Sequence, residues 1–183
     1  MNLYETKINA IVILLSSILV ASCDESADTQ SLNTTNDPVI IASSKPTVAL
    51  TSEQVNATVG ETFTLDITMS NFPTSEGGGV TVKFDPSILN VSNVTISSEV
   101  WNFVNRAGEI DNNAGVISDI LFSSFNGISE DSNVATITFS AISSGNSQIS
   151  LETSSINPFS SNGSEIAANF VHTNVQVTTS TVN

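Results

Sequence analysis

The chain has 183 residues, of which 39% are hydrophobic and 12% charged, enough apolar material for one globular domain with a core. Its 4 lysines and arginines stand against 18 aspartates and glutamates, which gives a formal net charge of -14 at pH 7. Nucleic acids and anionic membrane surfaces are bound through basic side chains, so this charge argues against both as partners.

The first segment has the composition of an export signal. Lys7 precedes an apolar stretch from Ile8 to Ser22, which is shorter than the roughly 20 residues that span a bilayer. The stretch ends in Val20-Ala21-Ser22-Cys23, which resembles the lipobox of bacterial lipoproteins. This resemblance implies that residues 1–22 are a signal peptide and that lipid chains on Cys23 anchor the protein in the inner or outer membrane of the cell envelope. The chain has one cysteine, which excludes an intrachain disulfide.

The next segment, residues 23–46, is predicted to be a flexible tether. It is rich in serine, threonine, asparagine and aspartate, and its only apolar island is Val39-Ile40-Ile41. So little apolar surface does not offset the entropy lost on ordering the chain. The folded domain is therefore expected over residues 47–178, followed by a C-terminal tail at 179–183.

From Thr47 onward, apolar and polar residues alternate in short runs between turn residues, without the 3.6-residue spacing of an amphipathic helix. The clearest run is 63–69, in which Phe63 and every second residue after it are expected in the core. Residues 79–85 form another, with Val80, Val82 and Phe84 buried, until Pro86 ends the strand.

Two further segments are predicted to be strands. Residues 100–104 are expected to place Trp101 and Phe103 on one face. Residues 116–122 are apolar on both alternating rows, so periodicity does not decide which row is buried. About nine strands without crossover helices predict an all-β fold, an antiparallel jelly-roll-like β-sandwich.

Three blocks of sequence together resemble a cohesin domain: Val59 to Leu65, Gly79 to Val91, and Ala135 to Leu151. The similarity extends over about Thr47 to Thr178. It implies a nine-stranded sandwich, of a type shared with carbohydrate-binding modules, and a role in docking dockerin modules of polysaccharide-degrading complexes. Typical type-one members of the family carry a polar side chain at the position of Gly79, where this chain has none.

A partner-binding surface is expected on one sheet face, formed by residues 79–85 and 116–122. Its predicted contact residues are Thr81, Lys83, Asp119 and Leu121. Lys83 is one of few cations and would serve as a charge-assisted anchor for an acidic or hydroxyl-rich protein partner, dockerin-like or other. An exposed apolar row beside this charge is typical of a docking surface.

Two alternative functions remain open. A carbohydrate-binding module acting directly on a polysaccharide would need exposed, coplanar aromatic rings, for which the candidates are Trp101, Phe103, Phe122 and Phe125. A structural envelope lipoprotein would need no specific ligand.

Catalysis is not expected from this sequence, nor is a cofactor or a metal. His172, the single histidine, lacks a nucleophile-elbow motif elsewhere in the chain. Glu130 and Asp131 are adjacent, so on a strand they would point in opposite directions and not form the paired carboxylates of a glycosidase. The run from Asp111 to Asn113 has oxygen ligands suited to calcium, but a turn rich in Asp and Asn is the favoured interpretation.

The lipobox predicts a thioether-linked lipid on Cys23. Radiolabelled palmitate supplied to a bacterial host is expected to label the wild-type chain, and a Cys23→Ser variant is expected to remain unlabelled because it lacks the thiol that accepts the lipid. Equal labelling of the two chains would contradict the prediction.

Overall fold

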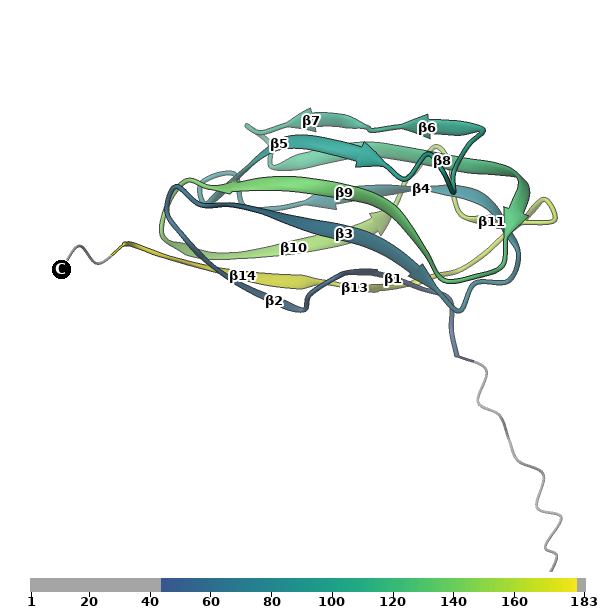
Figure 1. Ribbon diagram of the computed structural model, residues 1–183, viewed down its shortest axis with the longest axis horizontal. Coiled ribbons are helices and arrows are strands. Elements are labelled where there is room, and N and C mark those ends of the chain that lie inside the picture. The colour runs from purple at the N-terminus through teal and green to yellow at the C-terminus, as the bar shows by residue number, and fades with distance from the viewer. Residues whose placement is uncertain (1–43, 181–183) are drawn as a thin grey trace, which may run out of the picture. The chain divides into compact units, whose positions relative to one another are not determined.

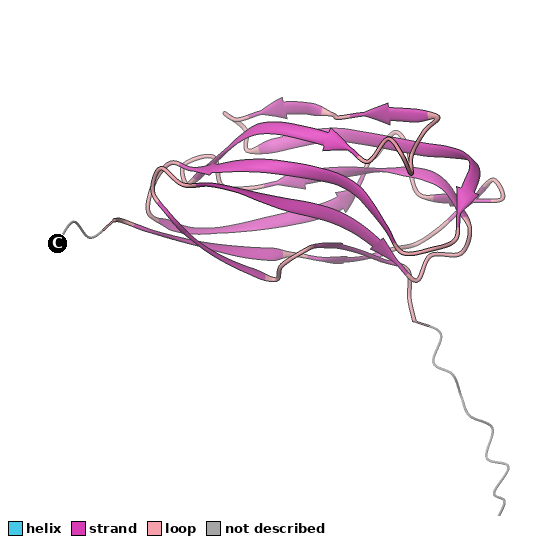
Figure 2. Cartoon of the chain, viewed as in Figure 1, coloured by secondary structure: helices cyan, strands magenta, loops and turns pink. Residues whose placement is uncertain are grey.

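The computed structural model describes residues 44–180, which fold into a sandwich of two β-sheets (Figure 1). Within these residues the chain consists of strands and loops, and no helix is long and apolar enough to cross a membrane (Figure 2). The predicted all-β sandwich is therefore confirmed. The predicted signal peptide, Cys23 and the tether up to residue 43 lie outside the described residues.

Each sheet has a simple strand order. The first contains, in order, β13 (Asn169–Val171), β1 (Thr47–Leu50), β3 (Thr62–Ser70), β9 (Ser132–Ala141) and β5 (Leu89–Ile96). The second contains, in order, β12 (Ser164–Glu165), β11 (Ser160–Ser161), β4 (Ser75–Lys83), β10 (Gly145–Thr153), β14 (Thr173–Thr178) and β2 (Gln54–Thr58). β8 (Val116–Ile128) pairs with β4 as well, and β6 (Val104–Arg106) and β7 (Glu109–Asp111) pair with β8.

Most of the strand pairs are antiparallel, as predicted, but two are parallel. β1 pairs in parallel with β13, and β2 pairs in parallel with β14. These four strands come from the two ends of the domain, and each sheet receives one early and one late strand. Alternation along a strand reports which face is buried and carries no information on the direction of the neighbouring strand, so the sequence did not reveal these two pairs.

The core lies between the sheets and is filled by the alternating residues that the sequence indicated. Val80 and Val82 are fully buried, and Phe84 is 6% exposed. Phe139 on β9 forms the centre of an aromatic cluster, with the Phe63 ring stacked 5.5 Å away and the Phe84 ring edge-on at 5.9 Å, measured between ring centroids. Phe63 is only partly buried, because it lies near the beginning of β3.

The strand predicted at residues 100–104 is wrong for its first part. The backbone N–H groups of Val100 and Trp101 both donate to the carbonyl of Ser97, so the chain turns there. Trp101 is fully buried while Phe103 is 68% exposed, so the two rings do not share a face. Trp101 closes one end of the core instead, since its indole Nε1–H donates to the carbonyl of Asn133 at 3.1 Å.

A β-bulge on β8 decides which of its two apolar rows is buried. Val80 on β4 faces Ile120, whereas Val82 faces Ile117, so β8 has one residue more than β4 between these pairs. The bulge contains Asp119, whose backbone φ of 57° lies in the left-handed region. Ile117 before the bulge and Ile120 after it are both fully buried. The two rows therefore each contribute to the core, on opposite sides of the bulge.

The aromatic cluster predicts that three phenylalanines contribute differently to the free energy of unfolding. Phe84→Ala is expected to lower the free energy of unfolding by about 3–5 kcal/mol, because it leaves a cavity beside Phe139. Phe63→Ala is expected to cost less, and the exposed Phe103→Ala is expected to stay within about 0.5 kcal/mol of wild type. Urea unfolding of the three variants measures this order, and a Phe84→Ala variant as stable as Phe103→Ala would contradict it.

Candidate functional site

The four residues predicted to bind a partner come together on the outer face of the second sheet. Thr81 and Lys83 point outward from β4, opposite in alternation to the buried Val80 and Val82. β8 lies directly beside β4, and its bulge turns Asp119 and Leu121 to the same outer side. The structure thus places these four side chains on one face, while their role in binding remains a prediction.

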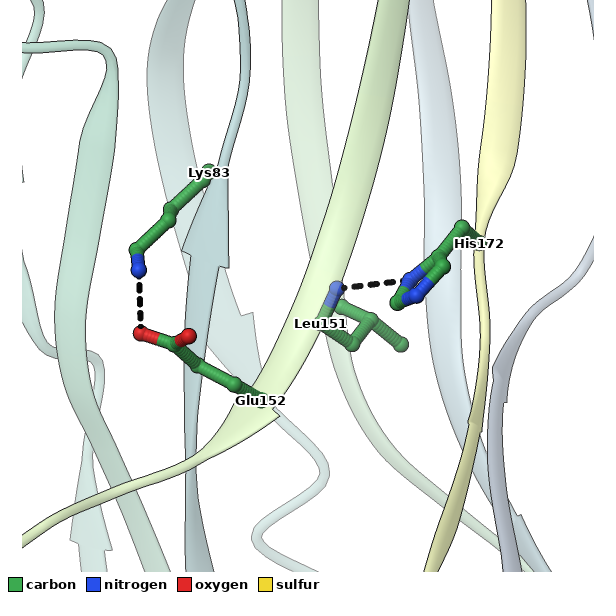
Figure 3. A network of polar contacts seen from close by, with 4 residues as sticks. All are labelled: Lys83, Leu151, Glu152 and His172. Atoms are coloured by element: carbon green, nitrogen blue, oxygen red, sulfur yellow. Dashed lines mark hydrogen bonds and ion pairs between the residues drawn. The ribbon is translucent and has the colours of Figure 1, made fainter.

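Lys83 already has a partner within the domain. Its Nζ lies 2.7 Å from the Oε1 of Glu152 on β10, and both side chains are about half exposed, 50% and 51% (Figure 3). Glu152 pairs in register with Thr81, so it is a diagonal neighbour of Lys83 across two adjacent strands. An ion pair this exposed contributes only about 0–1 kcal/mol to stability. Its main effect is to neutralise the cation that the sequence suggested as an anchor.

Asp119 is also engaged in the fold. Its Oδ1 accepts a hydrogen bond of 2.6 Å from the hydroxyl of Ser154, which is 1% exposed. The backbone N–H of Ser154 donates to the carbonyl of Gly79 at 2.8 Å. Asp119 therefore connects β8 to the segment that follows β10, across the intervening strand β4.

Gly79 has no side chain because its neighbours occupy the space on the outer face. A Cβ on Gly79 would lie 2.6 Å from the Cβ of Ser154 and 2.7 Å from the Cδ2 of Leu121. Real Cβ atoms do not approach other atoms this closely, so even alanine would displace one of the two. The absence of a polar side chain here, noted from the sequence, is thus a consequence of Leu121 and Ser154 packing over β4.

Besides Glu152 on β10, sequence reasoning missed three residues of this surface. Val104 and Arg106 on β6 pair in register with Ser123 and Leu121 of β8, which places them on the outer face. Ile156 lies in the segment after Ser154 and is 62% exposed. No periodic signal marks them, because β6 has only three residues and Ile156 belongs to a loop.

These residues together define a surface that we name the recognition face. Its members are Thr81, Lys83, Val104, Arg106, Asp119, Leu121, Glu152 and Ile156. Val104 is 40% exposed, and Leu121 is partly buried. Leu121 is its apolar centre, because β8 lies between β6 and β4, and charged side chains project from the neighbouring strands β6, β4 and β10.

The four aromatic candidates for sugar stacking do not form one platform. Trp101 and Phe122 are fully buried and pack on each other with ring centroids 4.7 Å apart. Phe103 and Phe125 are exposed, 68% and 82%, and their rings lie 6.1 Å apart. The planes of this exposed pair are tilted by 57°, so they do not present a flat surface to a sugar ring.

His172 has a structural contact. Its Nδ1 accepts a hydrogen bond of 3.2 Å from the backbone N–H of Leu151 (Figure 3). β10 and β14 are paired up to Ile149 and Thr173, and Leu151 lies beyond the last of these pairs. The imidazole thus replaces a backbone carbonyl where the ladder ends.

The segments considered for calcium use their oxygens for backbone contacts. The Oδ1 of Asp111 accepts from the N–H groups of Asn113 and Ala114 at 2.9 and 3.0 Å, an Asx turn. The amide of Asn112 pairs with both the N–H and the carbonyl of Val91. Among residues 44–180, no group of three or more acidic, histidine or cysteine side chains is placed to hold a metal ion.

One cleft of about 490 Å³ lies where the end of β8 and the beginning of β9 meet the turn around Val100. It is formed by the turn around Val100 and by the segment that leads from β8 into β9. Glu99, Glu130 and Asp131 line it, and Asp131 accepts a hydrogen bond from the N–H of Asn71. None of the predicted partner-binding residues contributes to this cleft.

Comparison with protein families matches residues 48–177 to the model described as cohesin domain. The fold is similar to that of a cohesin in the type I Coh-OlpC–Doc435 complex from Clostridium thermocellum, with 18% identity, a TM-score of 0.62, and coverage of 74% of this chain and 94% of that one. The seventh ScaB type I cohesin from Pseudobacteroides cellulosolvens is 22% identical, with a TM-score of 0.57 and coverage of 75% and 95%.

A non-cellulosomal cohesin from the archaeon Archaeoglobus fulgidus is similar too, with 14% identity, a TM-score of 0.58, and coverage of 74% of this chain and 92% of that one. A search of the curated proteins gives no match. At these sequence identities, the similarity to the solved structures shows the fold alone.

The hydrogen bond between Asp119 and Ser154 predicts a difference between two substitutions. Asp119→Ala is expected to destabilise the domain by about 1–3 kcal/mol, because it leaves the O–H of the buried Ser154 without its acceptor. Asp119→Asn is expected to cost less, since asparagine keeps an oxygen acceptor and tolerates the left-handed backbone. Thermal unfolding of both variants tests this, and equal melting temperatures would show that the hydrogen bond does not hold the segment.

Proposed function

Because the chain is a member of the cohesin domain family, we propose that its recognition face docks a protein partner. Cohesin domains act as docking modules, and solved relatives were determined as complexes with dockerins. The proposed partner of this chain is a dockerin or a protein that presents a similar surface.

One observation carries the proposal: apolar side chains are exposed on an outer sheet face that nothing in the described part of the chain covers. Ile156 in the loop after β10 and Val104 on β6 are 62% and 40% exposed, and Leu121 lies on β8, which pairs with β6. Protein interfaces commonly combine an apolar centre with a polar rim. Here Lys83, Glu152 and Arg106 supply the rim.

The surrounding groups are held in place before any partner arrives. Asp119 is hydrogen-bonded to Ser154, and Lys83 is paired with Glu152. The first contact joins β8 to the segment after β10, and the second joins the adjacent strands β4 and β10, so the face is built on a rigid element. A preorganised surface binds with less loss of side-chain entropy.

We also propose that the domain works at the cell envelope. The support is the lipobox-like Val20-Ala21-Ser22-Cys23 at the end of an apolar segment, which would attach the chain to a membrane through Cys23. A docking module held there would retain its partner at the cell surface or in the periplasm. A link to polysaccharide binding or breakdown is part of the proposal, through enzymes that bear the partner module.

Direct binding of a polysaccharide is the weaker alternative on this geometry. Two of its four aromatic candidates, Trp101 and Phe122, are buried, and the remaining pair is tilted. An aromatic ring stacks on a sugar only with an accessible, suitably oriented face. Phe103 and Phe125 are accordingly better suited to packing against a protein.

Site-specific photo-crosslinking tests the proposed face. Benzoylphenylalanine at Val104 in the full chain, expressed in the producing bacterium, is expected to crosslink to a protein that mass spectrometry identifies. The same group at Gln176, on the outer face of β14, is the matched control and is expected to give no such product.

The affinity of the crosslinked protein for variants of the chain then tests whether it binds the recognition face or another part of the surface. With the crosslinked protein purified, Leu121→Asp is expected to weaken binding by at least about thirtyfold, since it places a charge in the apolar centre. Identical crosslinks from positions 104 and 176, or full affinity of Leu121→Asp, would locate the site elsewhere. Retention on insoluble polysaccharide without any protein crosslink would favour the carbohydrate-binding alternative.

A further inference from the structure

Two of the three cationic side chains in residues 44–180 belong to the recognition face. These residues contain Lys45, Lys83 and Arg106 as their lysines and arginines. The two cations of the face differ in their surroundings. Lys83 is paired with Glu152 at 2.7 Å, whereas no carboxylate within residues 44–180 lies within ion-pair distance of Arg106.

Arg106 lies against the apolar centre of the face. It pairs in register with Leu121, whose Cδ2 reaches across to the space above Gly79. Val104 is two residues away on β6, on the same side of the sheet. A guanidinium beside exposed apolar groups is the combination found at energetic hot spots of protein interfaces, because its stem packs while its planar head binds a carboxylate through two hydrogen bonds.

The acidic groups on this side of the sheet leave Arg106 uncommitted. Glu152 is taken by Lys83, and the Oδ1 of Asp119 accepts from Ser154. Glu109 pairs with Ser118 and is separated from Arg106 by the two unpaired residues Ala107 and Gly108, without forming an ion pair with it. The net charge of -14 on the whole chain opposes the approach of a strongly acidic segment. A partner segment with a single carboxylate among apolar residues could pair with Arg106 and would be repelled much less than a strongly acidic one.

We infer that the partner segment docked on the recognition face carries an aspartate or glutamate that pairs with Arg106, next to a large apolar side chain that packs on Leu121 and Ile156. This inference rests on the proposed docking function and specifies the chemistry of the partner. Lys83 is not the anchor, since a partner carboxylate would first have to displace Glu152 from it.

A displayed library of random twelve-residue peptides, selected on the immobilised full chain, tests the inference. Wild type is expected to enrich peptides in which an acidic residue is adjacent to a large apolar one. Arg106→Gln is expected to abolish the acidic preference and keep the apolar one, and Arg106→Glu to replace it with a preference for lysine and arginine. Lys83→Gln, the matched cation on the same face, is expected to leave the selection as in wild type.

A synthetic copy of a recovered peptide measures how much the acidic residue contributes to affinity. Replacing its acidic residue by the amide is expected to weaken binding to wild type by about tenfold, and to have little effect on binding to Arg106→Gln. The same acidic preference on Arg106→Gln, or its loss on Lys83→Gln alone, overturns the assignment to Arg106 and leaves the docking face intact. Peptides that bind Leu121→Asp as well as wild type, or a library without face-dependent binders, overturn the docking function together with this inference.

Discussion

The close approach of β8 and of the segment after β10 to the glycine-rich part of β4 is the constraint on which the recognition face depends. On the core side, a Cβ at Gly78 would lie 2.6 Å from the ring of Phe159. On the outer side, a Cβ at Gly79 would collide with Leu121 and Ser154. Consecutive glycines thus let β4 accept a buried aromatic ring on one face and an apolar surface residue on the other. Without them, neither the core nor the outer face could have its present packing.

The bulge on β8 has an equally specific effect, because it changes which residues point outward partway along the strand. Ile117 and Ile120 both enter the core although they are three positions apart, a spacing that in a regular strand would place them on opposite faces. Asp119, at the bulge, is placed where its carboxylate meets Ser154. The resulting hydrogen bond spans β4 and fixes the position of the loop that carries Ile156. A local irregularity in one strand therefore assembles side chains from three separate segments.

Much of the fold could be predicted from sequence, because alternation directly reports burial. The buried rows at Val80 and at Leu65 follow from it, as does the sandwich class. The bulge could not be predicted, since a segment that is apolar on both rows fits either register. The strand predicted around Trp101 and Phe103 was wrong because two aromatic residues two positions apart fit the alternation of a strand. The N–H groups of Val100 and Trp101 instead donate to the carbonyl of Ser97, and the chain turns there. The site was predicted only in part. Thr81, Lys83, Asp119 and Leu121 do lie on one face. The contact of Lys83 with Glu152 was not predicted, because it depends on a register between strands far apart in sequence.

Electrostatics limits where an acid-bearing partner can approach this domain. The chain carries 18 acidic residues, and their repulsion acts over about 8 Å at physiological ionic strength before salt screens it. Within that distance of the recognition face, Lys83 cancels Glu152, and Arg106 adds a charge that no described carboxylate offsets by direct contact. The apolar centre supplies contact area that salt does not weaken. An acidic body with a locally neutralised, partly apolar face thus disfavours random association over most of its surface, while the face itself allows a partner to bind close to Arg106.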